Sequence, residues 1–322
     1  MIEFPFLPGA RIEATQLNKA HRLWILKWLA EIEEGIEQFE VSSSICLAGL
    51  IAETWIYGRP KTDWIGIMRE YLEKDDLPLA YSEEYGKRLF KFNQWKQSPV
   101  HAIYARWWIE RTIEAEERDW AQTIKNYIQP SGWIYNPDVS LTNTKTRMRT
   151  ELFMSMQMGC EILKTYEFEG IPTDRLVAAT ISIPCTGYVS AEYFRYRALQ
   201  FLGATEQMVT GIEKTLNKLQ IQQGFADFSV EDKIDDYMGS KKRITRDVAV
   251  FSPIATLYAL SLACNLSVPK DLIEEWKSRV KTHLNNDPLG IPALHMRDLA
   301  PEFGDGQTIY EVLAAAVLLQ TH

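Results

Sequence analysis

The chain has 322 residues, of which 46% are hydrophobic and 24% charged, and this composition is typical of a globular protein and excludes disorder as a description of the whole. Its net charge of −8 creates an average field that repels nucleic acid and anionic membrane surfaces. No apolar run reaches the ~20 residues needed to span a bilayer, and no secretory signal is recognisable, so we expect a soluble, cytoplasmic protein that binds neither nucleic acid nor membrane.

Helical periodicity dominates the first part of the chain. Apolar residues recur at three- and four-residue steps over residues 14–39, which predicts an amphipathic helix. Residues 45–56 are apolar on most faces, which predicts a buried helix, so an outer helix followed by an inner one is the simplest interpretation. Helical spacing continues over residues 61–72, 82–95 and a long stretch at 100–128, with polar or proline-bearing turns between them.

No convincing strand is found in the sequence. Only residues 177–183 are rich in β-branched side chains, and the preceding Thr173 and Asp174 favour a helix there. The cysteines and histidines are widely scattered, which supports neither a zinc site nor a histidine-led catalytic triad. We therefore expect free thiols at all four cysteines, namely Cys46, Cys160, Cys185 and Cys264.

A repeated unit marks the second half of the chain. A glycine beside an aromatic or apolar residue, then a polar loop, then a buried-looking helix occurs at Gly132-Trp133, Gly187-Tyr188, Gly224-Phe225 and Gly290-Ile291. Helix pairs of this kind must stack on one another to bury their apolar faces. We predict a single all-α domain over 1–322 whose helix pairs close into an α/α toroid or barrel, with 1–128 as an N-terminal helical portion and 129–322 as a repeat portion. An irregular multi-helix globule is the alternative.

Two of these loops resemble the turns of a known superfamily. Gln129-Pro-Ser-Gly132-Trp133 and Gln222-Gln223-Gly224-Phe225 are similar to the Gln-x-x-x-Gly-x-Trp turns of terpenoid cyclases and protein prenyltransferases. The resemblance implies the α/α toroid of that superfamily. The acidic Asp-x-Asp-Asp motif of squalene-type cyclases is missing, and the prenyltransferase zinc ligands are not recognisable, so the resemblance carries over a fold and neither activity.

Basic residues precede two of the apolar helices. In a toroid the loops before inner helices gather at one end, where helix N-termini favour anions. Arg147 and Arg246 lie at such helix starts, where acidic residues are ordinarily preferred, and could hold a phosphate or carboxylate. The alternative is that these arginines snorkel over neighbouring helices or form structural salt bridges to Glu151 and Asp247. The predicted ligand-binding residues are Arg147, Arg149, Lys242, Arg243, Arg246, Tyr135, Trp133 and Tyr188.

An acidic stretch lies between the two basic loops. Asp232 and Asp236 are four residues apart and share one helical face, where paired carboxylates could ligate Mg²⁺ or divide acid and base roles. With Asp138 they are the predicted catalytic residues, and Asp232 and Asp236 the predicted metal ligands; a solvated acidic surface is the alternative. The cofactor is otherwise unknown, and Mg²⁺ bridging a phosphate is the chemically coherent candidate.

Aromatic residues complete the prediction. A central cavity lined by aromatic faces would suit an apolar chain, a carbocation or a sugar ring, and core filler is the alternative. The candidate aromatic residues are Trp107, Trp108, Trp133, Tyr188, Tyr193, Phe194 and Tyr196. We expect an enzyme or enzyme-like binder acting on an anionic small molecule, phosphorylated or of isoprenoid type, in a central helical cavity. The alternative is a non-catalytic helical-repeat scaffold whose partner is a protein.

Overall fold

The computed structural model describes residues 7–8, 16–36, 43–64, 66–67, 100–112, 119–135, 146–226, 251–266, 268–289 and 306–320. Within these residues the chain forms eleven α-helices, a short 3-10 helix and one two-stranded hairpin, which confirms the all-α prediction. None of the helices described is long and apolar enough to cross a membrane.

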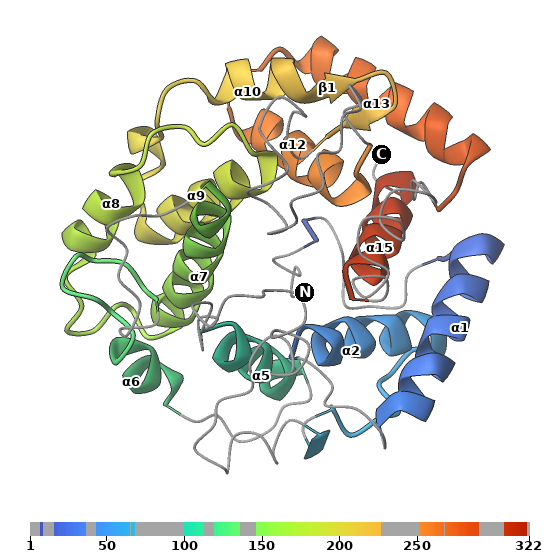
Figure 1. Ribbon diagram of the computed structural model, residues 1–322, viewed down its shortest axis with the longest axis horizontal. Coiled ribbons are helices and arrows are strands. Elements are labelled where there is room, and N and C mark those ends of the chain that lie inside the picture. Colours follow the sequence, from blue (N-terminus) through green and yellow to red (C-terminus); the bar gives the residue numbers. More distant parts are fainter. Residues whose placement is uncertain are drawn as a thin grey trace, which may run out of the picture.

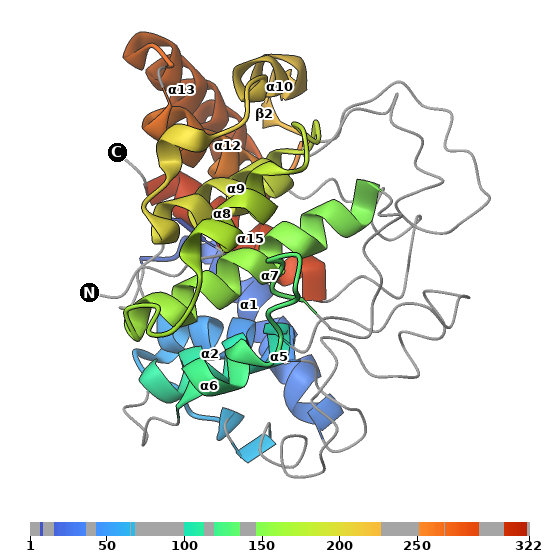
Figure 2. The same cartoon turned by 90° about the vertical axis from the view of Figure 1, so that its left-hand side faces the viewer.

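The helices lie in two layers around a common centre (Figure 1). The inner layer consists of α2 (Ser43–Tyr57), α5 (Val100–Thr112), α7 (Thr146–Thr165), α9 (Val189–Leu202), α12 (Pro253–Asn265) and α15 (Gly306–Gln320). The outer layer consists of α1 (Lys19–Ile36), α6 (Trp120–Lys125), α8 (Thr173–Ile181), α10 (Ile212–Leu219) and α13 (Lys270–Asn286). Turned by 90°, Figure 2 shows α10 and α13 at one edge, α2, α5 and α6 at the opposite edge, and α7, α8 and α9 between them.

Burial separates the two layers as the sequence predicts. The outer helix α13 buries Ile273, Trp276, Val280 and Leu284, a stripe at three- and four-residue steps, and these are four of its 17 residues. The inner helix α9 buries ten of its 14 residues, because neighbouring helices cover it on several sides. In each pair, the amphipathic helix therefore lies in the outer layer and the more apolar helix lies in the inner layer.

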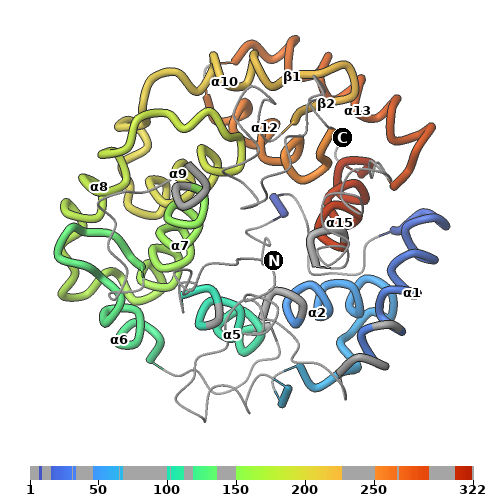
Figure 3. Tube along the Cα trace, viewed as in Figure 1, coloured from blue at the N-terminus to red at the C-terminus, as the bar shows by residue number. Residues whose placement is uncertain are grey.

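Each inner helix contacts the next one along the chain, and α15 contacts α1 and α2. Figure 3 shows the same order as a colour gradient, with blue α1 and α2 beside red α15. Two hydrogen bonds join the chain's early and late parts: the Gln320 amide donates to the Gln16 carbonyl at 2.7 Å, and the His21 ring donates from Nε2 to the Pro288 carbonyl at 2.6 Å. Burial lowers the pKa of His21 despite this bond, so the ring is neutral and suited to a buried contact.

The sequence prediction needs one correction in the first half. The stretch 100–128 forms two helices and not one, since α5 ends at Thr112 and α6 begins at Trp120. Asp119 caps α6 by accepting a hydrogen bond from the backbone of Gln122 at 3.1 Å, which is how a short acidic side chain starts a new helix. Residues 177–181 are helical, as expected, at the end of α8. The predicted helix at 82–95 lies outside the described residues, as does 68–72.

The two glycine turns that resemble the superfamily motif have similar structures. After α6, Ile128 pairs with Ile134 across a turn at Gly132, and after α10, β1 (Gln220–Ile221) pairs with β2 (Gly224–Phe225). Gly132 has φ +89°, and an added Cβ would lie 2.3 Å from the Arg175 carbonyl oxygen, so only glycine fits. Each hairpin follows an outer helix and precedes an inner one.

All four cysteines are free, as the sequence predicts. Cys46 and Cys160 are buried in α2 and α7, and burial raises the pKa of both thiols, that of Cys46 to about 12. These two thiols are therefore protonated and unreactive at neutral pH.

Candidate functional site

Most of the predicted charged site residues lie outside the residues that the structure describes. Asp138, Asp232, Asp236, Lys242, Arg243 and Arg246 lie outside the described residues. Arg147 and Arg149 belong to the first turn of α7, and their side chains are also outside the description. The anion site and the Mg²⁺ site therefore stay predictions.

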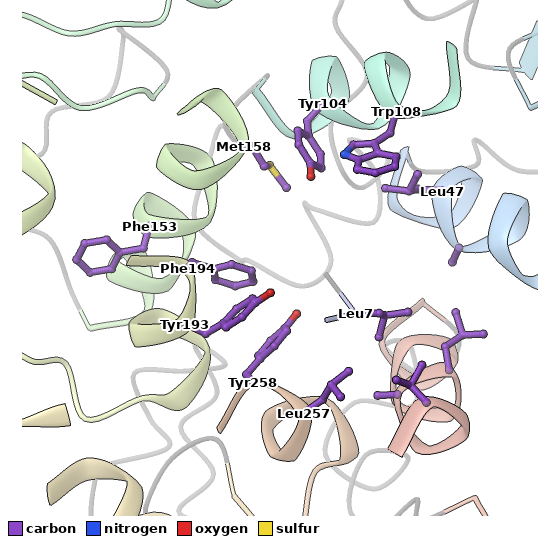
Figure 4. Packing of buried hydrophobic residues seen from close by; sticks show 14 of the residues in the cluster. Leu7, Leu47, Tyr104, Trp108, Phe153, Met158, Tyr193, Phe194, Leu257 and Tyr258 are labelled. Atoms are coloured by element: carbon purple, nitrogen blue, oxygen red, sulfur yellow. The ribbon is translucent and has the colours of Figure 1, made fainter. Parts of the chain in front are cut away.

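The three aromatic residues of the predicted ligand-binding set, Trp133, Tyr135 and Tyr188, are described, and all are buried. Trp133 packs edge to face on Phe153 of α7, with ring centroids 5.5 Å apart, and Phe153 points away from the common centre in Figure 4. The Tyr135 hydroxyl lies 3.5 Å from a Glu151 carboxylate oxygen near the start of α7. Tyr188 is the residue before α9. Trp133 and Tyr135 thus pack beside α7, while Tyr188 begins the next inner helix.

Other aromatic side chains face the centre between the inner helices. Figure 4 shows Tyr104 and Trp108 of α5, Tyr193 and Phe194 of α9 and Tyr258 of α12 around it, with Met158 of α7 and the fully buried Leu7. Tyr193 and Tyr258 stack with ring centroids 4.2 Å apart and planes 8° apart, and Phe194 meets Tyr258 edge to face at 5.4 Å. The inner helices thus present aromatic faces and phenol hydroxyls to one region.

A polar cluster joins α5 to α7 beside these aromatics. The Tyr104 hydroxyl and the Gln157 amide both donate to Oε2 of Glu161, each at 2.7 Å. Tyr104 and Gln157 are fully buried, and Glu161 is partly exposed. Burial raises the pKa of Glu161 to about 7, although the hydrogen bond from Tyr104 and the charges of Arg197 and Arg111 act in the opposite direction. A carboxyl group with this pKa can gain or lose a proton at neutral pH.

A second polar pair joins the same two helices nearer their N-terminal ends. Ser155 Oγ and His101 Nε2 are 3.1 Å apart, and both residues are buried. Burial lowers the pKa of His101 to about 4, so the ring is neutral at pH 7. Within the described residues no carboxylate is hydrogen-bonded to His101, so the pair lacks the orienting acid of a catalytic triad.

Other buried carboxylates hold loops. Glu192 of α9 accepts hydrogen bonds from the Thr186 backbone and hydroxyl, both at 2.7 Å, and lies 3.4 Å from Arg195. Arg195 in turn donates to the Pro184 carbonyl at 3.0 Å. Arg197 faces elsewhere, as its two-residue spacing from Arg195 requires, and donates to Gln200 at 2.7 Å. The Glu192 group fixes the loop before α9 and has a structural role.

Sequence reasoning missed Tyr104, Gln157, Glu161 and the pair of His101 with Ser155. Tyr104 and Glu161 are 57 positions apart, so no local motif links them. One signal was available: Glu161 interrupts an apolar stretch on the inner side of the repeat, where an acidic residue needs a partner.

Metal ligands are not gathered in the part of the chain that the structure describes, where no three His, Cys, Asp or Glu residues are placed to hold an ion. The candidate site consists of the aromatic side chains between the inner helices and the neighbouring carboxyl group of Glu161, which Tyr104 contacts. Comparison with known protein families, with curated proteins and with solved structures found no match.

Proposed function

We propose that this protein is an α/α toroid of the kind found in terpenoid cyclases, and that its centre binds a small molecule with an apolar body and an anionic group. The protein would be an enzyme or an enzyme-like binder of that molecule. Two features support the fold: α15 contacts α2, which brings the last inner helix to the first, and the hairpins after α6 and α10 are alike. The first is expected of a closed ring, and the second is expected of repeated helix pairs.

The aromatic centre is the observation that carries the proposal. Tyr104, Tyr193 and Tyr258 come from three inner helices and face one region in Figure 4. Aromatic faces bind apolar chains and stabilise cations, and phenol hydroxyls add a few directed hydrogen bonds. A core built only for stability would have no need to collect tyrosines at the meeting point of its inner helices.

Binding of an isoprenoid series tests the apolar part of the proposal. Farnesol and farnesyl diphosphate should both raise the melting temperature, because each stabilises the native state by RT ln(1 + [L]/Kd). Replacing Tyr258 by leucine should weaken their binding roughly tenfold, as expected for the loss of one aromatic contact. Phe225→Leu is the matched control, since Phe225 is an equally buried aromatic that packs on Trp276 of the outer helix α13.

The anionic part has its own test at the predicted loops. Inorganic diphosphate should raise the melting temperature, more so with Mg²⁺ if Asp232 and Asp236 bind the metal. Arg147→Ala and Arg246→Ala should each abolish this rise while the protein stays folded. If the substitutions unfold the protein, or if no phosphorylated compound changes the melting temperature, the non-catalytic scaffold becomes the better description.

A further inference from the structure

The side chain of Leu7 lies at the centre of the inner layer. Figure 1 shows residues 7–8 as a short blue stretch between the inner helices, and Figure 4 shows Leu7 among labelled side chains of α2, α5 and α12. Leu7 has no exposed surface and belongs to the same apolar cluster as these side chains. The next helix along the chain, α1, begins at Lys19 in the outer layer, so Leu7 reaches the centre independently of the helix pairs.

Leu7 is held at the centre by apolar contacts and not by hydrogen bonds. Residues 7–8 belong to no helix or strand, and in the described part of the chain neither of them makes a hydrogen bond. The loop after α2 is different, because Glu53 accepts hydrogen bonds from the backbone N–H groups of Lys61 and Thr62, at 2.7 and 3.0 Å. Apolar contacts have no direction, so a ligand that offers similar apolar surface can replace Leu7 without breaking a hydrogen bond.

The position of Leu7 coincides with the binding region proposed above. Tyr193 and Tyr258 face the centre in Figure 4, and Leu7 and Leu257 lie in the same region. All four side chains are buried. Protein interiors are close-packed and contain few voids larger than a water molecule. The apolar body of a ligand and the side chain of Leu7 therefore cannot occupy this region at the same time.

We propose that Leu7 is a built-in competitor of the ligand, and that an apolar molecule binds at the centre only after the Leu7 side chain has left it. In the blocked form Leu7 fills the centre, as in this structure, and in the open form the side chain lies outside. The proposal rests on the proposed function for the class of ligand. It adds a mechanism by which the protein's own chain sets the affinity of that site.

This competition has a measurable size. Where the blocked form dominates, the apparent Kd is the intrinsic Kd divided by the small fraction of open form. Replacing Leu7 by alanine removes most of the apolar surface that holds the side chain, which should shift the equilibrium toward the open form by about tenfold or more. The apparent Kd for an apolar ligand should fall by the same factor, because the ligand no longer displaces a leucine.

Farnesol is the probe, because it has no anionic group and its binding does not depend on the predicted basic loops. Calorimetric titration should show that Leu7→Ala binds farnesol about tenfold more tightly than the wild type. Leu284→Ala is the matched control, since Leu284 of the outer helix α13 likewise has no exposed surface. This variant loses a similar apolar contact away from the centre, so its affinity for farnesol should stay within about twofold of the wild type.

A measurement on Leu7 itself tests the displacement in the wild-type protein. In protein labelled with ¹³C at the leucine methyl groups, the Leu7 signals are those that disappear in Leu7→Met, a variant of similar side-chain volume. Saturating farnesol should move these signals to the chemical shifts of an exposed leucine. The signals of Leu284 should keep the positions that they have in the free protein.

The outcomes separate this proposal from the proposed function. Tighter binding of farnesol by Leu7→Ala, with or without measurable binding by the wild type, would support both. Equal affinity in the two proteins, or Leu7 signals that stay in place at saturation, would overturn the competition and leave the aromatic site intact. Absence of farnesol binding in both proteins would overturn both proposals.

Discussion

Glu192 and Glu161 both lie on inner helices, yet their surroundings differ. Glu192 accepts a backbone hydrogen bond from Thr186 and pairs with Arg195, and its side chain is fully buried. Among the residues that the structure describes, the hydrogen bonds to Glu161 come from side chains, those of Tyr104 and Gln157, and Glu161 is partly exposed. Glu53 and Glu311 resemble Glu192, since each accepts at least one backbone N–H from a loop or a helix start.

The difference distinguishes carboxylates that hold the backbone from one that is held by side chains alone among the described residues. A carboxylate that accepts backbone hydrogen bonds has its oxygens committed to holding that segment. A carboxyl held by side chains can gain a proton while the backbone stays in place. The Glu192 group therefore holds the backbone in place, and the Glu161 group is a part of the inner layer whose protonation can change near neutral pH.

Removing Glu192 should have the largest effect. Glu192→Ala removes a buried carboxylate that accepts two hydrogen bonds from Thr186 and pairs with the buried Arg195, and the free energy of unfolding should fall by about 3–5 kcal/mol. Urea unfolding followed by circular dichroism measures this. Glu275→Ala, which breaks the exposed pair with Arg279 on α13, should cost less than about 1 kcal/mol. A loss below 1 kcal/mol for Glu192→Ala would contradict the structural role assigned to Glu192 in its comparison with Glu161.

Acid should destabilise the helix pair α5 and α7 through His101. Its pKa falls from 6.5 in the unfolded chain to about 4 in the fold, so the unfolded state binds the proton first as pH is lowered. The stability that the neutral ring contributes is present above pH 6.5 and is lost between pH 6.5 and pH 4, by about 3 kcal/mol. Urea titrations across this range should show the loss in the wild type and a smaller one in His101→Gln.

Glu161→Gln should stabilise the protein at pH 8. A carboxyl whose pKa is raised from 4.5 to about 7 contributes stability below pH 4.5 that is lost as pH rises through 7. Glutamine has no such titration, so the variant does not lose this stability as the pH rises. After allowance for solvent screening of a partly exposed group, the free energy of unfolding of the variant at pH 8 should exceed that of the wild type by about 1–2 kcal/mol. The gain should vanish at pH 4.5. Glu192→Gln should be destabilising at pH 8, and a shared sign for the two variants would contradict the comparison.

The smallest effect is expected for Tyr104→Phe. Losing its hydroxyl removes one hydrogen bond from Glu161, which should cost about 1 kcal/mol at pH 8. Because this bond lowers the pKa of Glu161, Glu161 should titrate at a higher pH in the variant, as measured by NMR of protein labelled with ¹³C at the glutamate carboxyls. Tyr135→Phe is the control, since its hydroxyl lies 3.5 Å from Glu151 and does not touch Glu161. An unchanged Glu161 pKa in Tyr104→Phe would show that Tyr104 does not tune this carboxyl.

More of the fold than of the candidate site could be predicted from the sequence. Three- and four-residue spacing located α1, α2 and the outer and inner members of the later pairs, because burial of one helix face imposes that period. The break between α5 and α6 was missed, since the apolar spacing continues across it and Asp119 was not recognised as a cap. The predicted Arg147 and Arg246 site stays untested, because neither side chain belongs to the described residues.

The sequence by itself determined which residues form helices, which helices are apolar on most sides, and where only glycine can turn the chain. These properties depend on residues within a few positions of one another. The tertiary structure alone decided that Glu161 meets Tyr104 and Gln157 while Glu192 holds the Thr186 loop. The reason is physical: the pKa and the role of a buried carboxyl depend on which donors surround it, and for Glu161 a principal donor comes from a helix 57 residues away in the chain.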